Sequence, residues 1–531
     1  MNGDRRLLLR GGELVTGPDE PSTHADLLVV GDRIARIGAD LAAPGAEVID
    51  CDGRLVLPGF VDTHSHTDGV IFDSDVQEAN LRQGVTTVVI GQDGVGFAPG
   101  DGRYAADYFA TINGRHPTYR GGGIGALLDT YDRTVGMNVA ALVPAGTTRN
   151  EVMGNTDRPA EARELRAMEE MVREGMAQGA VGLSTGLDYV PGLYASAAEL
   201  TAMARPVAEV DGVHVSHMRH GYETAVPRGM AELAQIAQGS GVRTHVSHLH
   251  GPAAMIIPAL DAFGDGLEVT FDAYPYRRGC TLMTMPLLPA ALLGRGAEET
   301  LRVLRDPDQR EQLLKRQRAE IAARPDMGAE WPTRMSFVET GSAQWAWATG
   351  MTVADAARQV GEDPLVFAVR VLVDGMLKST AVMATPTQRS EDELARIFTD
   401  PRHRGGSDGI YIGGRPHPRG WGTFARFIAR YTFARGDLTI AQAVGHLSTG
   451  SIEVMRLGAR GRLRAGWHAD LIVMDPATVT DRADYASPRL TATGIDDVIV
   501  SGVPVLREGR RTDANPGRGI RRSPVPAHPE P

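Results

Sequence analysis

Apolar residues in the middle of the chain occur as short β-branched runs, and each run is followed by an amphipathic stretch. Stretches such as PAEARELRAMEEMVREGMAQG repeat their apolar positions every three or four residues and end at Gly, as helices do. Alternation of strands and helices is typical of a parallel sheet built from βα units. We interpret eight runs as strands: residues 59–64, 86–91, 138–146, 180–185, 212–217, 242–248, 267–275 and a weak one that ends at 405–408. Eight such repeats predict a closed (β/α)8 barrel of the TIM type.

The two ends of the chain have a different pattern, in which short apolar runs alternate with turns that contain Gly. This pattern covers residues 1–57 and returns at 455–514, and it predicts one small composite β-sandwich domain that both ends build. The barrel then spans residues 58–454. A stretch at about 281–345 is longer than a βα loop needs, so we expect a helical insertion over the barrel mouth. Residues 515–531 are rich in Pro, Gly and Arg and predict a disordered tail.

Composition places the chain among globular proteins, with 42% hydrophobic and 23% charged residues. Its formal net charge is −11 with both signs mixed, so a nucleic acid partner is not expected. The opening MNGDRRLLLR has only three consecutive leucines, which argues against a secretory or membrane-spanning segment and therefore against a membrane partner. The two cysteines, Cys51 and Cys280, are too few and too far apart for a disulfide framework. These features together predict a cytoplasmic enzyme.

Side chains that can bind a metal follow several of the predicted strands at the point where each strand ends. His64 and His66 close the first strand, and residues two apart in a strand point to the same side. The carboxyl ends of barrel strands form the face where barrel enzymes place their active sites. We therefore expect the candidate residues to meet there: His64, His66, Asp93 after the second strand, His217 at the end of the fifth, His248 at the end of the sixth and Asp408 after the eighth.

Imidazole and carboxylate donors suit a divalent cation such as Zn²⁺. Such a cation activates water and polarises an amide carbonyl, while a nearby carboxylate takes and returns the proton; Asp408 is our candidate for that carboxylate. Each residue also has an ordinary interpretation, because a histidine in a strand usually belongs to the core or surface and Asp93 or Asp408 could form a turn. Their joint position at strand ends favours the metal site.

Several motifs resemble those of the amidohydrolase superfamily: LPGFVDTHSHTD, the paired VSHMRHG and VSHLH, the SDG at 407–409, and GRLRAGWHADLIVMDP. Within it, AVGLSTGLDYVPGLYAS, FDAYPYRRGCTLMTMPLLP and HPRGWGTFARFI are similar to D-aminoacylases, the N-acyl-D-amino-acid deacylases. The similarity runs from residue 6 to about residue 510. It implies a zinc-dependent amidohydrolase that cleaves the linear amide of an N-acyl amino acid, a small-molecule substrate.

The resemblance also implies a role for each candidate: Asp408 as the catalytic acid/base, and His64, His66, His217 and His248 as ligands of one or two zinc ions. Strand two of that family normally ends in Gly-Asn-Cys-Gly, but this chain has GQDG at 91–94, so Asp93 takes the place of the metal-binding cysteine. A carboxylate is a harder ligand than a thiolate, and another divalent metal therefore becomes possible. Some related sites are bridged by a carbamylated lysine, but the only lysines, Lys315 and Lys378, lie far from the end of strand four.

Two positions that the resemblance assigns to substrate binding are changed. After the strand-six histidine the family usually has Leu-Lys, whereas here Leu249 precedes His250, whose imidazole is mostly neutral at pH 7. After DAYPY the family tends to have Ser-Thr, whereas here Cys280 precedes Thr281.

Three further residues of the predicted substrate site match the family. Arg419 of the HPRG motif can hold a carboxylate by a bidentate pair, or it can form a surface ion pair. Tyr189 and Tyr274 can hydrogen-bond the substrate or pack at the barrel rim.

Four functions follow from these observations. The first is a D-aminoacylase-like amidohydrolase. The second is an amidohydrolase that removes an aminoacyl group, including an L-residue, from a biosynthetic intermediate or a peptide-like amide. The third is a cyclic-amide hydrolase of the hydantoinase type, against which the missing bridging lysine argues. The fourth is an inactive scaffold, against which the complete set of candidate residues argues. The sequence leaves the acyl group, the chirality of the substrate and the oligomeric state open.

Overall fold

The computed structural model describes residues 5–324, 326–385 and 387–526. Both ends of the chain build one nine-stranded sheet, as the sequence predicts, and the order of its main path is β21-β20-β19-β18-β5-β1-β2-β3, with β4 paired to β1. The two halves join where β5 runs antiparallel to β18. The strands are β1 (Arg6–Leu14), β2 (Thr23–Val30), β3 (Arg33–Gly38), β4 (Glu47–Asp50), β5 (Leu55–Pro58), β18 (Leu471–Met474), β19 (Ile495–Val500), β20 (Val503–Arg507) and β21 (Arg510–Arg511).

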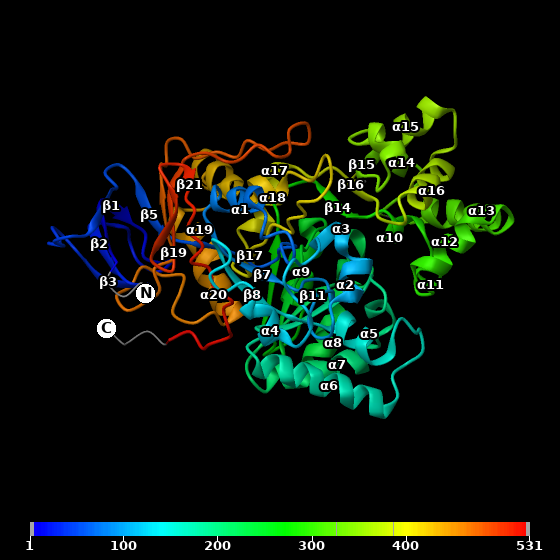
Figure 1. Cartoon of the computed structure of the whole chain (residues 1–531), viewed down its shortest axis with the longest axis horizontal. Helices are drawn as coiled ribbons and strands as arrows, with labels where there is room; N and C mark the ends of the chain where they lie inside the picture. The colour runs from blue at the N-terminus through cyan, green and yellow to red at the C-terminus, as the bar shows by residue number, and fades with distance from the viewer. Residues whose placement is uncertain (1–4, 325, 386, 527–531) are drawn as a thin grey trace.

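A parallel barrel occupies the centre of the molecule (Figure 1). Its strands follow one another in chain order: β6 (Phe60–Asp62), β7 (Val85–Ile90), β8 (Asn138–Ala141) with β9 (Val143–Pro144), β10 (Gly182–Gly186), β11 (Val213–His217), β12 (Arg243–Val246), β13 (Val269–Ala273) and β17 (His403–Gly405). The amide of Val181 donates to Ala141 O at 2.9 Å, and the amide of Thr63 donates to Gly405 O at 3.0 Å. These two bonds join the separate strand sets and close the ring, which confirms the predicted eight-stranded barrel.

Helices cover the outside of the barrel because each presents an apolar stripe to the strands. In α6, Met168, Val172 and Met176 recur every four residues and are buried, and a capping box of Glu161 and Glu164 begins the helix. The covering helices are α1 (Ser74–Leu81), α2 (Arg103–Tyr108), α3 (Ala110–Asn113), α4 (Ile124–Asp129), α5 (Ala145–Met153), α6 (Ala162–Ala177), α7 (Ala197–Ala208), α8 (Val226–Ser240), α9 (Ala253–Asp261), α17 (Glu391–Phe398), α18 (Arg419–Arg426), α19 (Ile440–Val444) and α20 (Gly450–Met455). Within the described ranges, none of the helices combines the length and apolar character that a membrane span requires.

The insertion is larger than the sequence predicts and is not purely helical. It begins at β14 (Arg278–Leu282) and returns through β16 (Thr380–Ala384). In a small three-stranded sheet, β16 lies between β14 and β15 (Met335–Glu339) and runs antiparallel to both. Its helices are α10 (Thr284–Leu287), α11 (Ala290–Leu293), α12 (Ala297–Arg305), α13 (Pro307–Ala323), α14 (Trp331–Arg334), α15 (Val353–Val360) and α16 (Pro364–Asp374). Leu304, Phe337 and Phe367 belong to its own apolar core. The predicted end at about residue 345 is wrong because β16 pairs with the first strand of the insertion and must belong to it.

The C-terminal segment also differs from the prediction of disorder. Arg133 N donates to Gly517 O at 2.8 Å, and Ile520 N donates to Val139 O at 2.7 Å. A Cβ atom at Gly519 would lie 2.2 Å from Leu128 O, so the glycine allows the backbone to approach this closely. The glycines of this segment therefore allow its backbone to pack closely against the barrel. The prediction of disorder is wrong for residues 515–526. Residues 527–531 of the predicted tail lie outside the described residues.

Candidate metal centre

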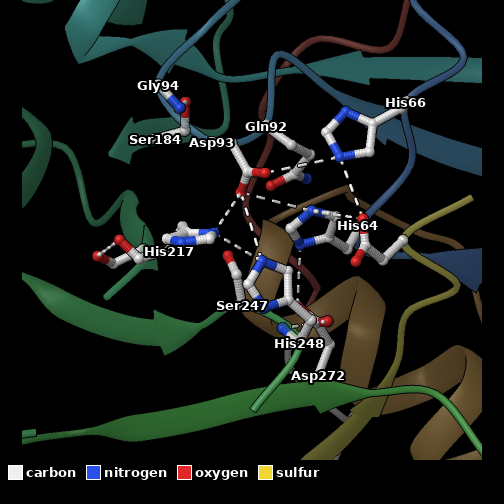
Figure 2. Close-up of polar contacts among 12 residues, drawn as sticks. His64, His66, Gln92, Asp93, Gly94, Ser184, His217, Ser247, His248 and Asp272 are labelled. Atoms are coloured by element: carbon white, nitrogen blue, oxygen red, sulfur yellow. Dashed lines mark hydrogen bonds and ion pairs between the residues drawn. The ribbon is translucent and has the colours of Figure 1, made fainter. Parts of the chain in front are cut away.

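The five predicted ligands converge at the carboxyl ends of the barrel strands (Figure 2), and Asp408, the predicted proton carrier, lies beside them. His64 and His66 follow β6, Asp93 follows β7, His217 ends β11, His248 follows β12, and Asp408 follows β17. All six side chains are at least nine-tenths buried. The structure therefore brings these six side chains together, and their roles as metal ligands and proton carrier stay predictions.

Asp93 lies in the middle of the histidines. Its Oδ1 atom is 3.7 Å from His64 Nε2, 3.7 Å from His248 Nε2 and 3.8 Å from His217 Nδ1. Its other oxygen, Oδ2, is 3.7 Å from His66 Nε2. One carboxylate thus faces two groups of imidazoles, an arrangement that can bridge two cations.

Asp408 completes the second group. Its Oδ1 atom lies 3.2 Å from His66 Nε2 and 3.8 Å from His64 Nε2. The ligating atoms of His64, His66 and Asp408 all lie within 4.8 Å of one another, and so do those of His64, Asp93 and His248.

These spacings fit a metal ion. Two donor atoms that are each ~2.1 Å from a tetrahedral cation lie about 3.4 Å apart, and the separations above are of that size. His64 Nε2 and Asp93 Oδ1 are buried and have no hydrogen-bond partner among the described residues. Leaving such atoms unmatched in the interior is costly, and a cation bound between them would satisfy both.

A surrounding set of polar side chains orients the candidate ligands. Asn113 Oδ1 lies 2.8 Å from His66 Nδ1, and Asp188 Oδ2 lies 3.3 Å from His217 Nε2, so in each ring the opposite nitrogen faces the centre. Asp272 accepts the amide of His248 at 2.7 Å, and its Oδ2 lies 3.5 Å from His64 Nδ1. Such partners fix the tautomer and angle of metal-binding histidines.

Sequence reasoning missed these supporting residues. Asp188 lies two residues beyond β10 and Asp272 lies within β13, so the position at a strand end was a usable signal for both. His245 is a further residue of this kind, because its Nε2 atom lies 3.1 Å from Asp272 Oδ2 and the residue is fully buried. It shares the inward face of the strands with Asp272, because the register pairs His245 with Thr270.

The backbone at three of the candidate ligands is in the left-handed region. The φ angles are 56° at Asp93, 35° at His248 and 49° at Asp408. Residues other than Gly rarely adopt this conformation, and where they do it is often at functional sites. The amide of Asp408 donates to His64 O at 2.8 Å, which ties the eighth strand end to the first.

Charges in the site move the pKa values of its groups. Burial alone would lower the pKa of His64, but the carboxylates of Asp272, Asp93 and Asp408 raise it to about 9. Burial alone would raise the pKa of Asp408, but the Arg419 guanidinium and the neighbouring histidines hold it well below its usual range. Asp408 is therefore a carboxylate at neutral pH, as a proton acceptor must be.

The predicted substrate-binding residues lie around this centre and differ in their burial and in their contacts. Arg419 is fully buried, and its Nη1 atom lies 2.8 Å from Asp408 Oδ2 while its guanidinium stacks over Tyr274 at 4.6 Å. The ring of Tyr189 packs 5.0 Å from that of His217. Thr281 lies on strand β14 of the insertion near Tyr189, and its Oγ1 atom is 3.9 Å from Met285 Sδ.

His250 faces away from the cation position. Its Nδ1 atom lies 2.9 Å from His248 O, its Nε2 atom lies 3.8 Å from Glu223, and its ring stacks on Tyr222 at 4.5 Å. Burial lowers the pKa of His250 to about 4, so the imidazole is neutral at pH 7.

Neither lysine reaches the end of strand four. Lys315 lies in α13, and Lys378 lies between α16 and β16, whereas β10 ends at Gly186. A lysine-bridged centre of the kind expected for the hydantoinase type therefore does not fit these strand ends.

Comparisons with known proteins agree with this geometry. A model described as the amidohydrolase family matches residues 47–506. The N-acyl-D-glutamate deacylase of Alcaligenes xylosoxydans xylosoxydans is 31% identical over 97% of this chain and 96% of its own length. The structure of the N-acyl-D-glutamate deacylase of Bordetella bronchiseptica with zinc and a phosphonate that mimics the tetrahedral intermediate is 31% identical, with a TM-score of 0.81 over 98% of this chain and 100% of that one. A D-aminoacylase structure that concerns a binuclear metal centre is 28% identical, with a TM-score of 0.80 over 97% of this chain and 99% of that one.

Proposed function

Because the chain belongs to the amidohydrolase family, we propose that it is a zinc-dependent hydrolase that cleaves the linear amide of an N-acyl amino acid. The observation that carries the proposal is the convergence of four histidines and two aspartates at donor spacing around buried, unpartnered atoms. The relatives that match nearly the whole chain are deacylases of N-acyl-D-amino acids, which supports the same substrate class. In this proposal the substrate is a small molecule, and neither a nucleic acid nor a membrane takes part in the reaction. The proposed location of the reaction is the cytoplasm.

Two positions for cations follow from the two faces of Asp93. Asp93 Oδ1, His217 and His248 would hold one ion, whereas His64, His66 and Asp408 would surround the other. A divalent cation in this centre supplies Lewis-acid activation of water and of the amide carbonyl. We propose zinc as the native ion. Because the carboxylate of Asp93 is a harder ligand than a thiolate, we expect manganese or cobalt to bind in its place as well.

The chain's own residues position the reactants and move the proton. Asp408 accepts a proton from water through the oxygen that faces His66 and returns it to the leaving nitrogen, which needs a group that is ionised at rest. Arg419 holds the other oxygen of Asp408 and so fixes the direction of the carboxylate. The buried ring of Tyr189 and the partly buried ring of Tyr222 both pack against His217 and reduce the access of bulk water to the same space.

A second candidate is the removal of an aminoacyl group from a larger intermediate or peptide-like amide. The observation in its favour is His250, which is neutral where the related enzymes usually carry a lysine. An amine product without a free carboxylate would not need that lysine.

A substrate panel tests the proposal. Protein loaded with zinc, cobalt or manganese is assayed with N-acetyl-D- and N-acetyl-L-amino acids and with aminoacyl amides, and bound metal is quantified in parallel. We expect metal-dependent release of free amine from at least one N-acyl amino acid. A metal-loaded protein that cleaves none of these amides would contradict the proposal and favour a scaffold.

A further inference from the structure

The guanidinium of Arg419 is held beside Asp408 by few contacts of its own. Its Nη1 atom lies 2.8 Å from Asp408 Oδ2, its Nη2 atom donates to Cys280 O at 3.4 Å, and its plane lies over the ring of Tyr274. Neither Nε nor Nη1 makes a hydrogen bond to another described residue, so the contact with Asp408 is an ion pair without hydrogen-bond geometry. The position of the guanidinium therefore depends on how firmly the backbone of Arg419 is placed.

His417 anchors that backbone. Its ring is fully buried, its Nδ1 atom accepts the amide of Arg419 at 3.0 Å, and its Nε2 atom lies 2.9 Å from Arg278 O. Because Nδ1 is an acceptor, the ring proton is on Nε2 and is donated to Arg278 O. Burial, and then the Arg419 guanidinium, hold the pKa of His417 well below its usual range, so the ring is neutral and keeps both bonds. One imidazole thus joins the first residue of α18 to the first residue of β14.

Three tyrosine rings enclose the imidazole of His417. The rings of Tyr276 and Tyr485 lie edge-on at 5.2 Å, and that of Tyr274 lies at 6.0 Å. Tyr485 Oη is also 3.4 Å from Nε2 of the imidazole. Tyr485 differs from the other two tyrosines because it comes from the composite domain, on the connection between β18 and β19, residues 475–494.

This connection packs against α18, the helix that begins at Arg419. Asp481 Oδ2 lies 3.5 Å from Arg426 Nη1, and the guanidinium of Arg489 lies 5.9 Å from the centre of the Trp421 ring. Both Trp421 and Arg426 belong to α18. The composite domain is therefore fixed to the same helix whose first residue His417 anchors.

Resting on the proposed function, we propose that His417 and Tyr485 are positioning residues of the hydrolase. His417 places the start of α18 so that Arg419 meets Asp408, and the connection of residues 475–494 holds His417 in place through Tyr485. No hydrogen bond or ring contact among the described residues joins His417 or Tyr485 to a candidate metal ligand, so their loss should spare metal binding. The composite domain thereby supports proton transfer without a group that touches the substrate.

Substitutions that imitate one ring nitrogen at a time separate the two bonds of His417. Asn places an acceptor near the position of Nδ1, Gln places its amide near that of Nε2, and Leu offers neither. We expect kcat/KM of the zinc-loaded protein to fall about 10- to 100-fold in His417→Leu and His417→Gln, the effect of a small misplacement, and to stay within about 3-fold of the wild type in His417→Asn. Equal losses in all three variants would overturn the proposal, because they would show that the ring only fills space.

Tyr485→Ala tests the contribution of the composite domain. We expect kcat/KM to fall about 2- to 10-fold, the value of an aromatic contact, with zinc content unchanged in elemental analysis. In an Arg419→Gln background the same substitution should cause no further loss, because the route through Arg419 is already broken. Leu490→Ala, at an exposed residue of the same connection, is the matched control and should equal the wild type. Losses that simply add in the double variant would overturn the proposal.

A readout without turnover distinguishes this proposal from the proposed function. Crystal structures of zinc-loaded His417→Leu and Tyr485→Ala report the distance from Arg419 Nη1 to Asp408 Oδ2, which is 2.8 Å in the intact protein. We expect this distance to exceed about 4 Å, the limit of an ion pair, in His417→Leu and to increase in Tyr485→Ala. That result supports the positioning role even if the wild type cleaves none of the tested amides. An unchanged pair of Arg419 and Asp408 in both variants would overturn the positioning role and leave the proposed function standing.

Discussion

At the scale of single residues, the contacts of Asp408 separate its role in catalysis from its role in folding. Its backbone amide binds His64 O and one carboxylate oxygen binds Arg419, while the other oxygen faces His66. Asp408→Asn keeps the backbone contact and the shape of the side chain but can no longer carry a proton. We expect kcat to fall about 10²- to 10⁴-fold with metal content largely kept, measured by turnover and elemental analysis. Retained turnover would assign the proton to another group.

We expect Asp93 to set the metal preference of the centre. Its carboxylate faces four histidines, so Asp93→Ala should lose bound metal. Asp93→Cys replaces the hard ligand with a soft one and should bind zinc in preference to manganese more strongly than the wild type does. Competition dialysis against both metals measures the change. Equal metal content in wild type and Asp93→Ala would show that Asp93 is not a ligand.

His64 gives the metal-free protein a specific pH dependence. Burial lowers the pKa of His64, but Asp272, Asp93 and Asp408 raise it by more, so that it lies at about 9 in the folded chain instead of the ordinary 6.5. Protonated His64 therefore contributes to the stability of the fold. This contribution is fully present below pH ~6.5 and is lost as the pH rises through about 9 and the imidazole loses its proton. We expect the metal-free protein to unfold more readily across that window and a His64→Asn variant to show a flatter profile. Urea unfolding at several pH values measures this, and metal-free stability that rises across the window would contradict it.

The residues that the sequence could predict are those next to a strand end. His64, His66, Asp93, His217, His248 and Asp408 could be found because their alignment depends only on barrel topology and the two-residue period of strands. Asn113 could not be identified in this way, because it lies in α3 and its role arises from a hydrogen bond to the side chain of His66.

At the scale of elements, the strands and helices of the barrel follow the apolar pattern closely, whereas the insertion and the C-terminal segment do not. Strand β16 is short and pairs with β14, nearly a hundred residues earlier in the chain, and no local pattern reports such pairing. The segment around Gly517 is rich in glycine and arginine but hydrogen-bonds to the loop before β8. The composition of a segment indicates the conformational entropy that it loses on folding. It does not indicate which backbone groups of other elements will hydrogen-bond to the segment.

Gly519→Val tests the contact of this C-terminal segment. A Cβ atom at that position would lie 2.2 Å from Leu128 O, so the segment must shift from the barrel. We expect a loss of about 1–3 kcal/mol in the free energy of unfolding, measured by urea denaturation. Gly38→Ala is the control, because a Cβ there has its nearest contact at an ordinary 3.6 Å. Equal stabilities of the two variants would show that the segment does not pack on the barrel in solution.

At the scale of the whole molecule, parts that are far apart in the sequence meet at one site. The barrel supplies the candidate metal ligands, and the insertion supplies Thr281 on β14. In Figure 1 the insertion lies on the opposite side of the barrel from the composite sheet. We expect substrate selection to change mainly through the insertion, because the composite sheet contributes none of these residues.

The most direct test of the metal centre is an anomalous diffraction map of the zinc-loaded crystal, recorded on both sides of the zinc absorption edge. We expect at least one strong peak about 2.0–2.2 Å from the donor atoms of Asp93 and of the histidines that face it. A fully zinc-loaded, active protein with no peak among His64, His66, Asp93, His217 and His248, or with its peak elsewhere, would contradict the account.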